Sequence, residues 1–201
     1  MRGVEYRRTS EINEQKSMST IIGITGNPAS GKDTVGDYLV SKGYTKITMS
    51  DILREEMTKL GIPTDRSSIH NYVTEMREKY GNGYLCQETI KRIKGNTVLS
   101  GLRNLEELKI FKERLGESFK LISVESPIET RYVRAKERGR IGDNISFERF
   151  KIEEEEEKNS HSGKFGVDLL IKQADFKIMN DGTISELFKK VDSILLALGV
   201  A

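Results

Sequence analysis

Short apolar runs alternate along the chain with longer segments whose apolar residues recur at helical spacing. The runs are rich in β-branched residues and end at turn-forming residues, which is typical of buried strands. Five strands are expected, at 21–25, 44–49, 97–100, 119–124 and 175–179. The segments between them predict helices at 35–40, 52–57, 67–80, 84–93, 105–115, 127–138, 147–158 and 166–172, with a last helix that begins after Thr183.

Strands that alternate with helices predict an α/β fold of three layers, α/β/α, built on a parallel, five-stranded sheet. Two helix starts carry local signals. Ser50 or Asp51 is expected to cap the helix after the second strand, and Pro127 is expected in the first turn of its own helix. In such sheets ligands bind at the carboxyl ends of the strands, so the residues that follow each strand are the candidates for chemistry.

The stretch after the first strand carries the strongest chemical signal. It is followed by a helix and reads Gly26-Asn27-Pro28-Ala29-Ser30-Gly31-Lys32-Asp33-Thr34. This order of strand, glycine-bounded loop and helix is the context of a phosphate-binding P-loop, in which backbone N–H groups and a helix N-terminus surround phosphate oxygens. We expect all nine residues to bind ATP, with Lys32 as a catalytic point charge on the outer phosphates. The alternative is a tight strand-to-helix turn with an exposed lysine.

Position 33 departs from the usual motif, in which a serine or threonine follows the lysine and contacts magnesium. Here Asp33 follows Lys32, and the hydroxyl comes one residue later, on Thr34. A carboxylate oxygen suits Mg²⁺, so Asp33 is the candidate metal ligand. Alternatively, Asp33 only stabilises the first helical turn through the helix dipole.

Composition limits the class of protein. A chain of 201 residues is long enough for one domain with its own core, and a net charge of +2 gives no global field for nucleic acid or membrane. The single cysteine, Cys86, excludes an internal disulfide and is expected to be a small buried residue. Residues 1–19 are polar and predict a disordered extension before a domain at 20–201. No stretch is apolar for long enough to span a bilayer, and a cytoplasmic protein is expected.

Arginines follow the second and third strands. Arg54 lies one turn after Asp51, where it could hold an acceptor phosphate or carboxylate. The alternative is a capping aspartate beside a solvated arginine. Arg103 ends the segment Ser100-Gly101-Leu102-Arg103, which follows the third strand.

A later helix carries further arginines at helical spacing, Arg131, Arg134 and Arg138, and Arg140 follows in the next loop. Phosphoryl transfer depends mainly on positioned positive charge, and arginines on a closing flap would also exclude water. We expect Arg138 and Arg140 to be catalytic, on a lid that covers about 131–160. The alternative is a basic, solvated helix face.

The order of these segments resembles P-loop kinases of the adenylate kinase and dephospho-CoA kinase clan. The Gly-Lys-Asp-Thr of the loop is similar to Gly-Lys-Gly-Thr in adenylate kinases, and 50–55 resembles their Gly-Asp-Leu-Leu-Arg-Glu segment, with Ser50 in place of glycine. Residues 174–183 look like the Ala-Asp-x-x-Ile-x-Asn-x-Gly-Thr/Ser stretch that lies beside the adenine in dephospho-CoA kinases. The resemblance therefore implies that Asn180 and Gly182 belong to the ATP site. A strand, a turn and a threonine cap explain the same residues.

The resemblance implies a P-loop NTPase fold with a short helical lid and acceptor-binding helices at about 51–94. It also implies acceptor contacts from Asp51, Arg54, Arg77 and Arg103. One departure concerns Ser100, because the related kinases have an aspartate there that orients magnesium waters. We expect the carboxylate of Asp33 to offset that loss.

These observations predict a phosphotransferase, dependent on ATP and Mg²⁺, that moves the terminal phosphoryl group to a small-molecule acceptor such as a nucleotide or dephospho-CoA. Asp51 is the expected base if the acceptor is a ribose hydroxyl. The alternative is an ATP-binding switch or assembly protein without metabolite kinase activity, which Ser100 favours. We expect a monomer or homodimer that binds neither nucleic acid nor membrane.

Overall fold

The computed structural model describes residues 19–139, 143–159 and 166–200. At its centre lies a parallel sheet of five strands in the order β2-β3-β1-β4-β5. Their bounds are Ile21–Thr25 for β1, Thr45–Thr48 for β2, Thr97–Ser100 for β3, Phe119–Glu125 for β4 and Phe176–Met179 for β5. The three-layer α/β fold expected from the sequence is confirmed.

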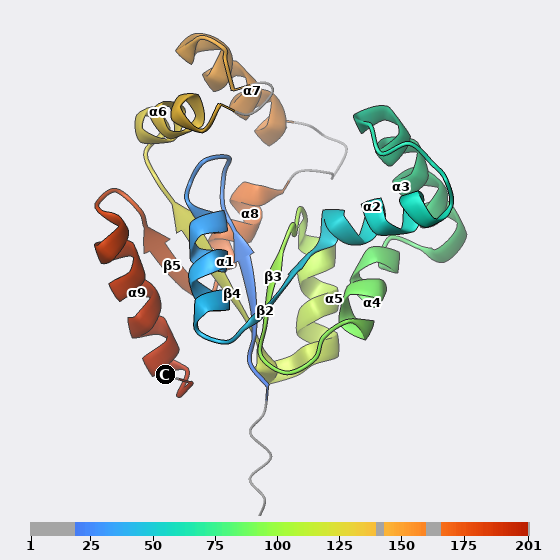
Figure 1. The fold of residues 1–201 in the computed structure, drawn as a ribbon, viewed down its shortest axis with the longest axis horizontal. Helices are drawn as coiled ribbons and strands as arrows, with labels where there is room; N and C mark the ends of the chain where they lie inside the picture. Colours follow the sequence, from blue (N-terminus) through green and yellow to red (C-terminus); the bar gives the residue numbers. More distant parts are fainter. Residues whose placement is uncertain (1–18, 140–142, 160–165, 201) are drawn as a thin grey trace, which may run out of the picture.

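Helices cover both faces of this sheet (Figure 1). Their bounds are Lys32–Ser41 for α1, Met49–Lys59 for α2, Arg66–Tyr80 for α3, Tyr84–Lys91 for α4, Leu105–Leu115 for α5, Ile128–Arg138 for α6, Phe147–Asn159 for α7, Val167–Lys172 for α8 and Ile184–Ala197 for α9, with a short 3-10 turn at Gly116–Ser118. None of the helices in the described ranges is long and apolar enough to cross a bilayer.

The strand pattern divides the core between the two faces. On one face Ile22 and Ile24 of β1 pack with residues of α1 and α9. On the other face Ile21 packs with residues of α4, α5 and α8, among them the fully buried Phe111. Successive side chains of a strand point to opposite faces, which is why each buried strand serves both helix layers. A third, smaller cluster joins α2 and α3.

The strand register brings the expected chemistry to one edge. Ile24 of β1 and Thr48 of β2 both pair with Ser100 of β3, and Thr25 pairs with Ser123 of β4. The four segments that follow these strands therefore start side by side. α6 and α7 lie beyond this edge of the sheet, above the loop between β1 and α1 (Figure 1).

Two expected helix starts are wrong. α2 begins directly after β2, with Thr48 at the N-cap position, so neither Ser50 nor Asp51 caps it. Met49 is 1% exposed and packs in the core, which favours an immediate turn into the helix. Pro127 occupies the N-cap position of α6 rather than its first turn, because its backbone is still extended at ψ 145°.

Candidate functional site

The loop between β1 and α1 has the backbone conformation of a phosphate cradle. Gly26 and Gly31 have φ values of 152° and 100°, which side chains rarely allow. A Cβ on Gly26 would lie 2.3 Å from the carbonyl oxygen of Val124, and one on Gly31 would lie 2.3 Å from Nδ2 of Asn180. Both glycines are therefore required by the close approach of the β4 and β5 ends.

Ala29 is left-handed at φ 59°, unlike any other described non-glycine residue. Such a conformation costs on the order of 1–3 kcal/mol and persists only where the surroundings impose it. One restraint acts on the next residue, where the Ser30 carbonyl accepts a hydrogen bond of 2.8 Å from the Asn180 side chain. The Ser30 amide also bonds back to the Asn27 carbonyl at 3.2 Å. One hydrogen bond within the loop and one from the segment after β5 therefore hold the loop in this conformation.

A pocket of about 440 Å³ opens above this loop. Its floor is formed by loop residues and the first turn of α1, and its other wall by α6. The lining residues are Ala29, Gly31, Lys32, Asp33, Thr34, Arg134, Glu137 and Arg138. Three of these side chains are cationic and two, Asp33 and Glu137, are anionic, and the N-terminus of α1 adds partial positive charge. The volume and charge suit a polyphosphate chain.

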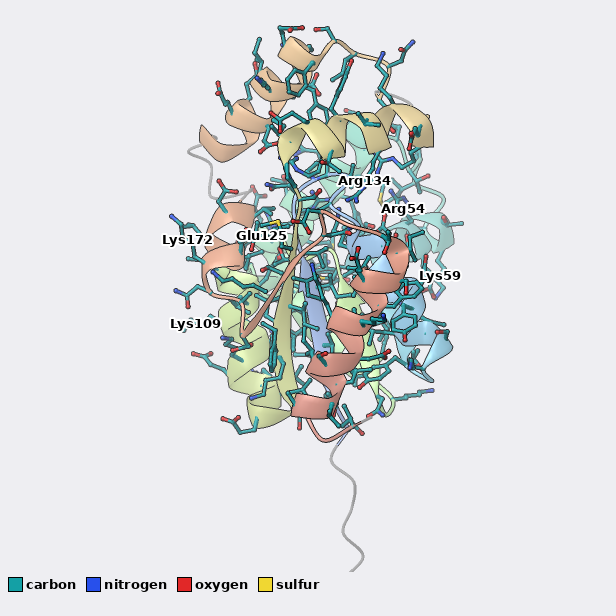
Figure 2. All side chains as sticks on the ribbon, turned by 90° about the vertical axis from the view of Figure 1, so that its left-hand side faces the viewer. Arg54, Lys59, Lys109, Glu125, Arg134 and Lys172 are labelled. Atoms are coloured by element: carbon teal, nitrogen blue, oxygen red, sulfur yellow. The ribbon has the colours of Figure 1, made fainter. Side chains whose placement is uncertain are left out.

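Arg134 is fixed at this pocket by two hydrogen bonds from Nη1. One goes to Oγ of Ser126 at 3.2 Å and the other to the carbonyl of Asn180 at 3.1 Å. Figure 2 shows Arg134 below α6, at the end of the sheet where Glu125 also lies. Arg134 was expected in the basic helix but not among the site residues. Its spacing of four from Arg138 was the signal that placed both on one face of α6.

Arg138 lines the same pocket and donates two hydrogen bonds to Asp143, from Nε at 3.0 Å and from Nη2 at 2.8 Å. The hydrogen bonds with Asp143 raise the pKa of Arg138, and the negative charge of Asp33 raises it further. Asp33 is therefore close enough to Arg138 to interact with it electrostatically. Arg140 lies outside the described residues. Arg131 is not among the residues that line the pocket; its buried guanidinium lies 2.6 Å from Glu154 on α7.

Thr48 and Ser100 connect the second and third strands at the same edge, because Oγ of Ser100 donates to Oγ1 of Thr48 at 3.1 Å. Asp51 and Arg54 follow in the first turns of α2, where Nη1 of Arg54 lies 3.0 Å from Oδ1 of Asp51. Both side chains are more than half exposed. Arg54 is exposed to solvent in α2, the helix that follows β2. Figure 2 shows it toward the same end of the molecule as Arg134.

Arg77 and Arg103 are brought together by a residue that sequence reasoning missed, Glu107 on α5. One carboxylate oxygen accepts from the Arg103 amide at 2.7 Å, and the other lies 3.8 Å from Nη2 of Arg77. Glu107 is 5% exposed, and this burial raises its pKa. The pattern Asn104-x-x-Glu107 is a helix-start signal that could have identified it, since Asn104 caps α5.

Three further expectations can be placed. Cys86 is fully buried, and burial raises the pKa of its thiol to about 12, which fits a packing role. Gly182 lies in the turn after β5, where a Cβ would meet the Glu186 carboxylate at 2.2 Å. Thr183 caps α9, as predicted, and forms a capping box with Glu186.

The residues around the loop fit a magnesium ion held jointly with phosphates. Across the described ranges no cluster of three or more histidine, cysteine or acidic residues could hold a metal by itself. Asp33 and Thr34 nevertheless line the pocket with hard oxygen donors. Mg²⁺ is commonly bound by one or two such ligands together with substrate phosphates.

Comparison with known proteins agrees with this geometry. Residues 22–159 match the family model described as an AAA domain. A UPF0200 protein of Sulfurisphaera tokodaii is 35% identical over 181 residues, which cover 89% of this chain and 97% of that protein. A UPF0200/UPF0201 protein of Archaeoglobus fulgidus is 31% identical over 184 residues, and there the chain spans only 55% of the relative's length.

A solved structure, the shikimate kinase of Bacteroides thetaiotaomicron, has the same fold with a TM-score of 0.56 and 14% identity, over 90% of this chain and 98% of that one. The P-loop conformation, the strand order and these matches lead to one conclusion. The chain belongs to the P-loop AAA-domain family and to the UPF0200 proteins, which have a P-loop kinase-like fold.

Proposed function

We propose that the protein is an ATP- and Mg²⁺-dependent phosphotransferase whose acceptor is a small molecule, either a nucleotide or dephospho-CoA. The observation that carries the proposal is the pocket between the P-loop and α6. Lys32 and Asp33 form its floor and Arg138 its opposite wall. Phosphoryl transfer needs positioned cations around the moving group. The arginines expected on the acceptor side favour a kinase over a switch, because a switch needs no acceptor clamp.

Several side chains of the pocket have a role in this reaction. The loop amides and Lys32 bind the phosphates of ATP, and Asp33 with Thr34 holds the magnesium ion, which neutralises charge on the phosphate oxygens. Arg138, with Arg140, stabilises the charge that spreads over the equatorial oxygens in the transition state. In the structure Arg138 pairs with Asp143, so the approach of phosphates would exchange one anionic partner for another.

The acceptor would bind at the ends of β2 and β3. Arg54, Arg77 and Arg103 would supply positive charge there, and Glu107 contacts both the guanidinium of Arg77 and the backbone amide of Arg103. A nucleotide phosphate is already anionic and needs no strong base. A ribose hydroxyl, as in dephospho-CoA, must lose its proton as the bond to phosphorus forms, and Asp51 would accept that proton. The bond between the terminal phosphorus and the bridging oxygen of ATP breaks, which leaves ADP.

We further propose that the protein works in the cytoplasm as a monomer or homodimer, without nucleic acid or membrane. The net charge of +2 supports the absence of nucleic-acid and membrane partners, since it gives no strong global field of one sign.

Incubation with ATP, Mg²⁺ and a panel of acceptors tests the proposal. The panel contains nucleoside monophosphates and dephospho-CoA, with shikimate added because a shikimate kinase shares the fold. ADP formation that depends on one acceptor, together with a phosphorylated product of matching mass, is the expected result. No transfer to any of these acceptors would contradict it.

The second candidate is an ATP-dependent switch or assembly protein. One observation favours it: the end of β3 carries Ser100, whose hydroxyl bonds to Thr48, in place of a carboxylate that could order magnesium waters. ADP formation at the same rate with and without every acceptor would support this candidate.

A further inference from the structure

We propose that Asn180 is a positioning residue of the ATP site, which fixes the P-loop at Ser30 and ties the loop to Arg134 on α6. The inference rests on the proposed binding of ATP phosphates by this loop. It differs from the adenine contact that the sequence suggested for Asn180, because the side chain is directed at the P-loop backbone. Asn180 is 6% exposed.

The side chain of Asn180 acts as a donor. Its Nδ2 lies 2.8 Å from the carbonyl oxygen of Ser30, in a buried bond that joins segments 150 residues apart. A carbonyl only accepts hydrogen bonds, so the amide group must present its NH₂ here. Gly31 leaves room for that group, since a Cβ at Gly31 would lie 2.3 Å from Nδ2. The absence of a side chain at Gly31 therefore allows the amide group of Asn180 to reach the Ser30 carbonyl.

The backbone of Asn180 joins two more segments to the same point. Its amide donates to the carbonyl of Glu125 at the end of β4, at 2.6 Å, and its carbonyl accepts from Arg134 at 3.1 Å. Arg134 lines the pocket above the loop. The P-loop, the end of β4 and the α6 wall of the pocket therefore share one buried residue.

This arrangement has a consequence for phosphate binding. The Ser30 carbonyl and the Gly31 amide belong to one peptide plane, so a bond to the carbonyl also sets the direction of that amide. The preceding residue, Ala29, is held at φ 59°, where an unrestrained alanine would relax. Loss of the Asn180 donor should let this peptide rotate, and the amides would then no longer converge on phosphate oxygens.

The test uses Asn180→Asp, which keeps the size of the side chain and replaces the donor by an acceptor. Asn180→Ala serves as a second variant, without the added charge. The matched control is Asn96→Asp, at the opposite edge of the sheet, where the side-chain oxygen of Asn96 accepts from the Thr20 amide at 2.9 Å and aspartate can do the same. Calorimetry measures the affinity for ATP, ADP and adenosine, and hydrogen exchange reports on the unliganded protein.

We expect both Asn180 variants to bind ATP and ADP about tenfold more weakly or worse, since a buried carbonyl loses its partner, while adenosine affinity and the Asn96→Asp protein stay unchanged. Amide exchange should accelerate at 26–34, whereas α6 should keep its protection because Arg134 bonds to the backbone carbonyl of Asn180, which both variants retain. Unchanged exchange in this loop, or an equal loss of affinity for adenosine, would overturn the proposal, and a uniform loss of stability would show a merely structural role. Hydrogen exchange is measured without ligand, and the binding assays use no acceptor. The result for Asn180 is therefore independent of whether the protein transfers a phosphoryl group to an acceptor.

Discussion

The carboxylate of Glu107 accepts a hydrogen bond of 2.7 Å from the backbone amide of Arg103. Its second oxygen lies 3.8 Å from Arg77. A buried carboxylate on α5 thus fixes the segment after β3 and holds a side chain of α3 close to it. Arg77 and Arg103 are two of the three arginines expected to bind the acceptor, and the strength of these contacts should depend on the charge of Glu107.

Replacement of Glu107 by glutamine should change how stability depends on pH. Burial raises the pKa of Glu107, so the folded state binds its proton more tightly than the unfolded state does. The free energy of unfolding should therefore fall as pH rises from the unfolded pKa of Glu107, about 4.5, through its higher folded pKa, because the folded protein must then hold a buried charge. Glu107→Gln lacks this dependence, and its melting temperature should rise relative to the native protein between pH 4 and 7. A constant difference across this range would contradict the assignment.

Lys32→Met should weaken ATP binding by at least tenfold and abolish turnover, because the phosphates lose the ammonium group that lines the pocket. Calorimetry with ATP and Mg²⁺ measures the affinity. Lys109→Met is the matched control, since Lys109 is an exposed lysine of α5 that pairs only loosely with Glu113, at 3.8 Å. Native-like ATP affinity in the Lys32 variant would remove the basis of the P-loop interpretation.

Asp33→Ala should abolish Mg²⁺-dependent turnover if its carboxylate serves the ion. Because the lysine and the loop amides remain, metal-free ATP binding should change much less than binding in the presence of Mg²⁺. A magnesium titration of ATP affinity in both proteins separates the two effects. Retained magnesium-dependent turnover would leave Asp33 with the role of stabilising the first turn of α1.

Arg131→Met should destabilise the pairing of α6 with α7. The Arg131 guanidinium lies 2.6 Å from Glu154, with side-chain exposures of 4% and 10%. Removal of one partner of a buried ion pair costs about 3–5 kcal/mol, because the other charge stays buried and uncompensated. Urea unfolding measures the loss.

Two further variants check the origin of that loss. Arg131→Met combined with Glu154→Leu should recover most of the stability, since no buried charge is then left alone. Arg149→Met removes an exposed arginine of α7 that pairs with Glu153, and it should change stability by less than about 1 kcal/mol. Equal losses in Arg131→Met and Arg149→Met would show that burial does not matter at this pair.

The sequence alone determined the fold and the phosphate loop. Strand periods, helix periods and the turn residues between them are local signals, and the spacing from Gly26 to Thr34 is fixed by the chain itself. The first residue of a helix depends on tertiary burial as well as on local signals. α2 begins at Met49, directly after β2, because the side chain of Met49 packs in the core.

Only the tertiary structure decided which polar residues meet. Arg131, Arg134 and Arg138 look alike in the sequence, but packing sends Arg131 to Glu154 and the other two to the pocket. Asn180 bonds to Ser30, which lies far away in the sequence, so no local pattern relates the two residues. Glu107 lies in the same local segment as Arg103, but its contact with Arg77 depends on how α3 and α5 pack. Such partners are set by strand order and by the crossing of helices, because buried polar groups must find partners wherever the fold brings them together.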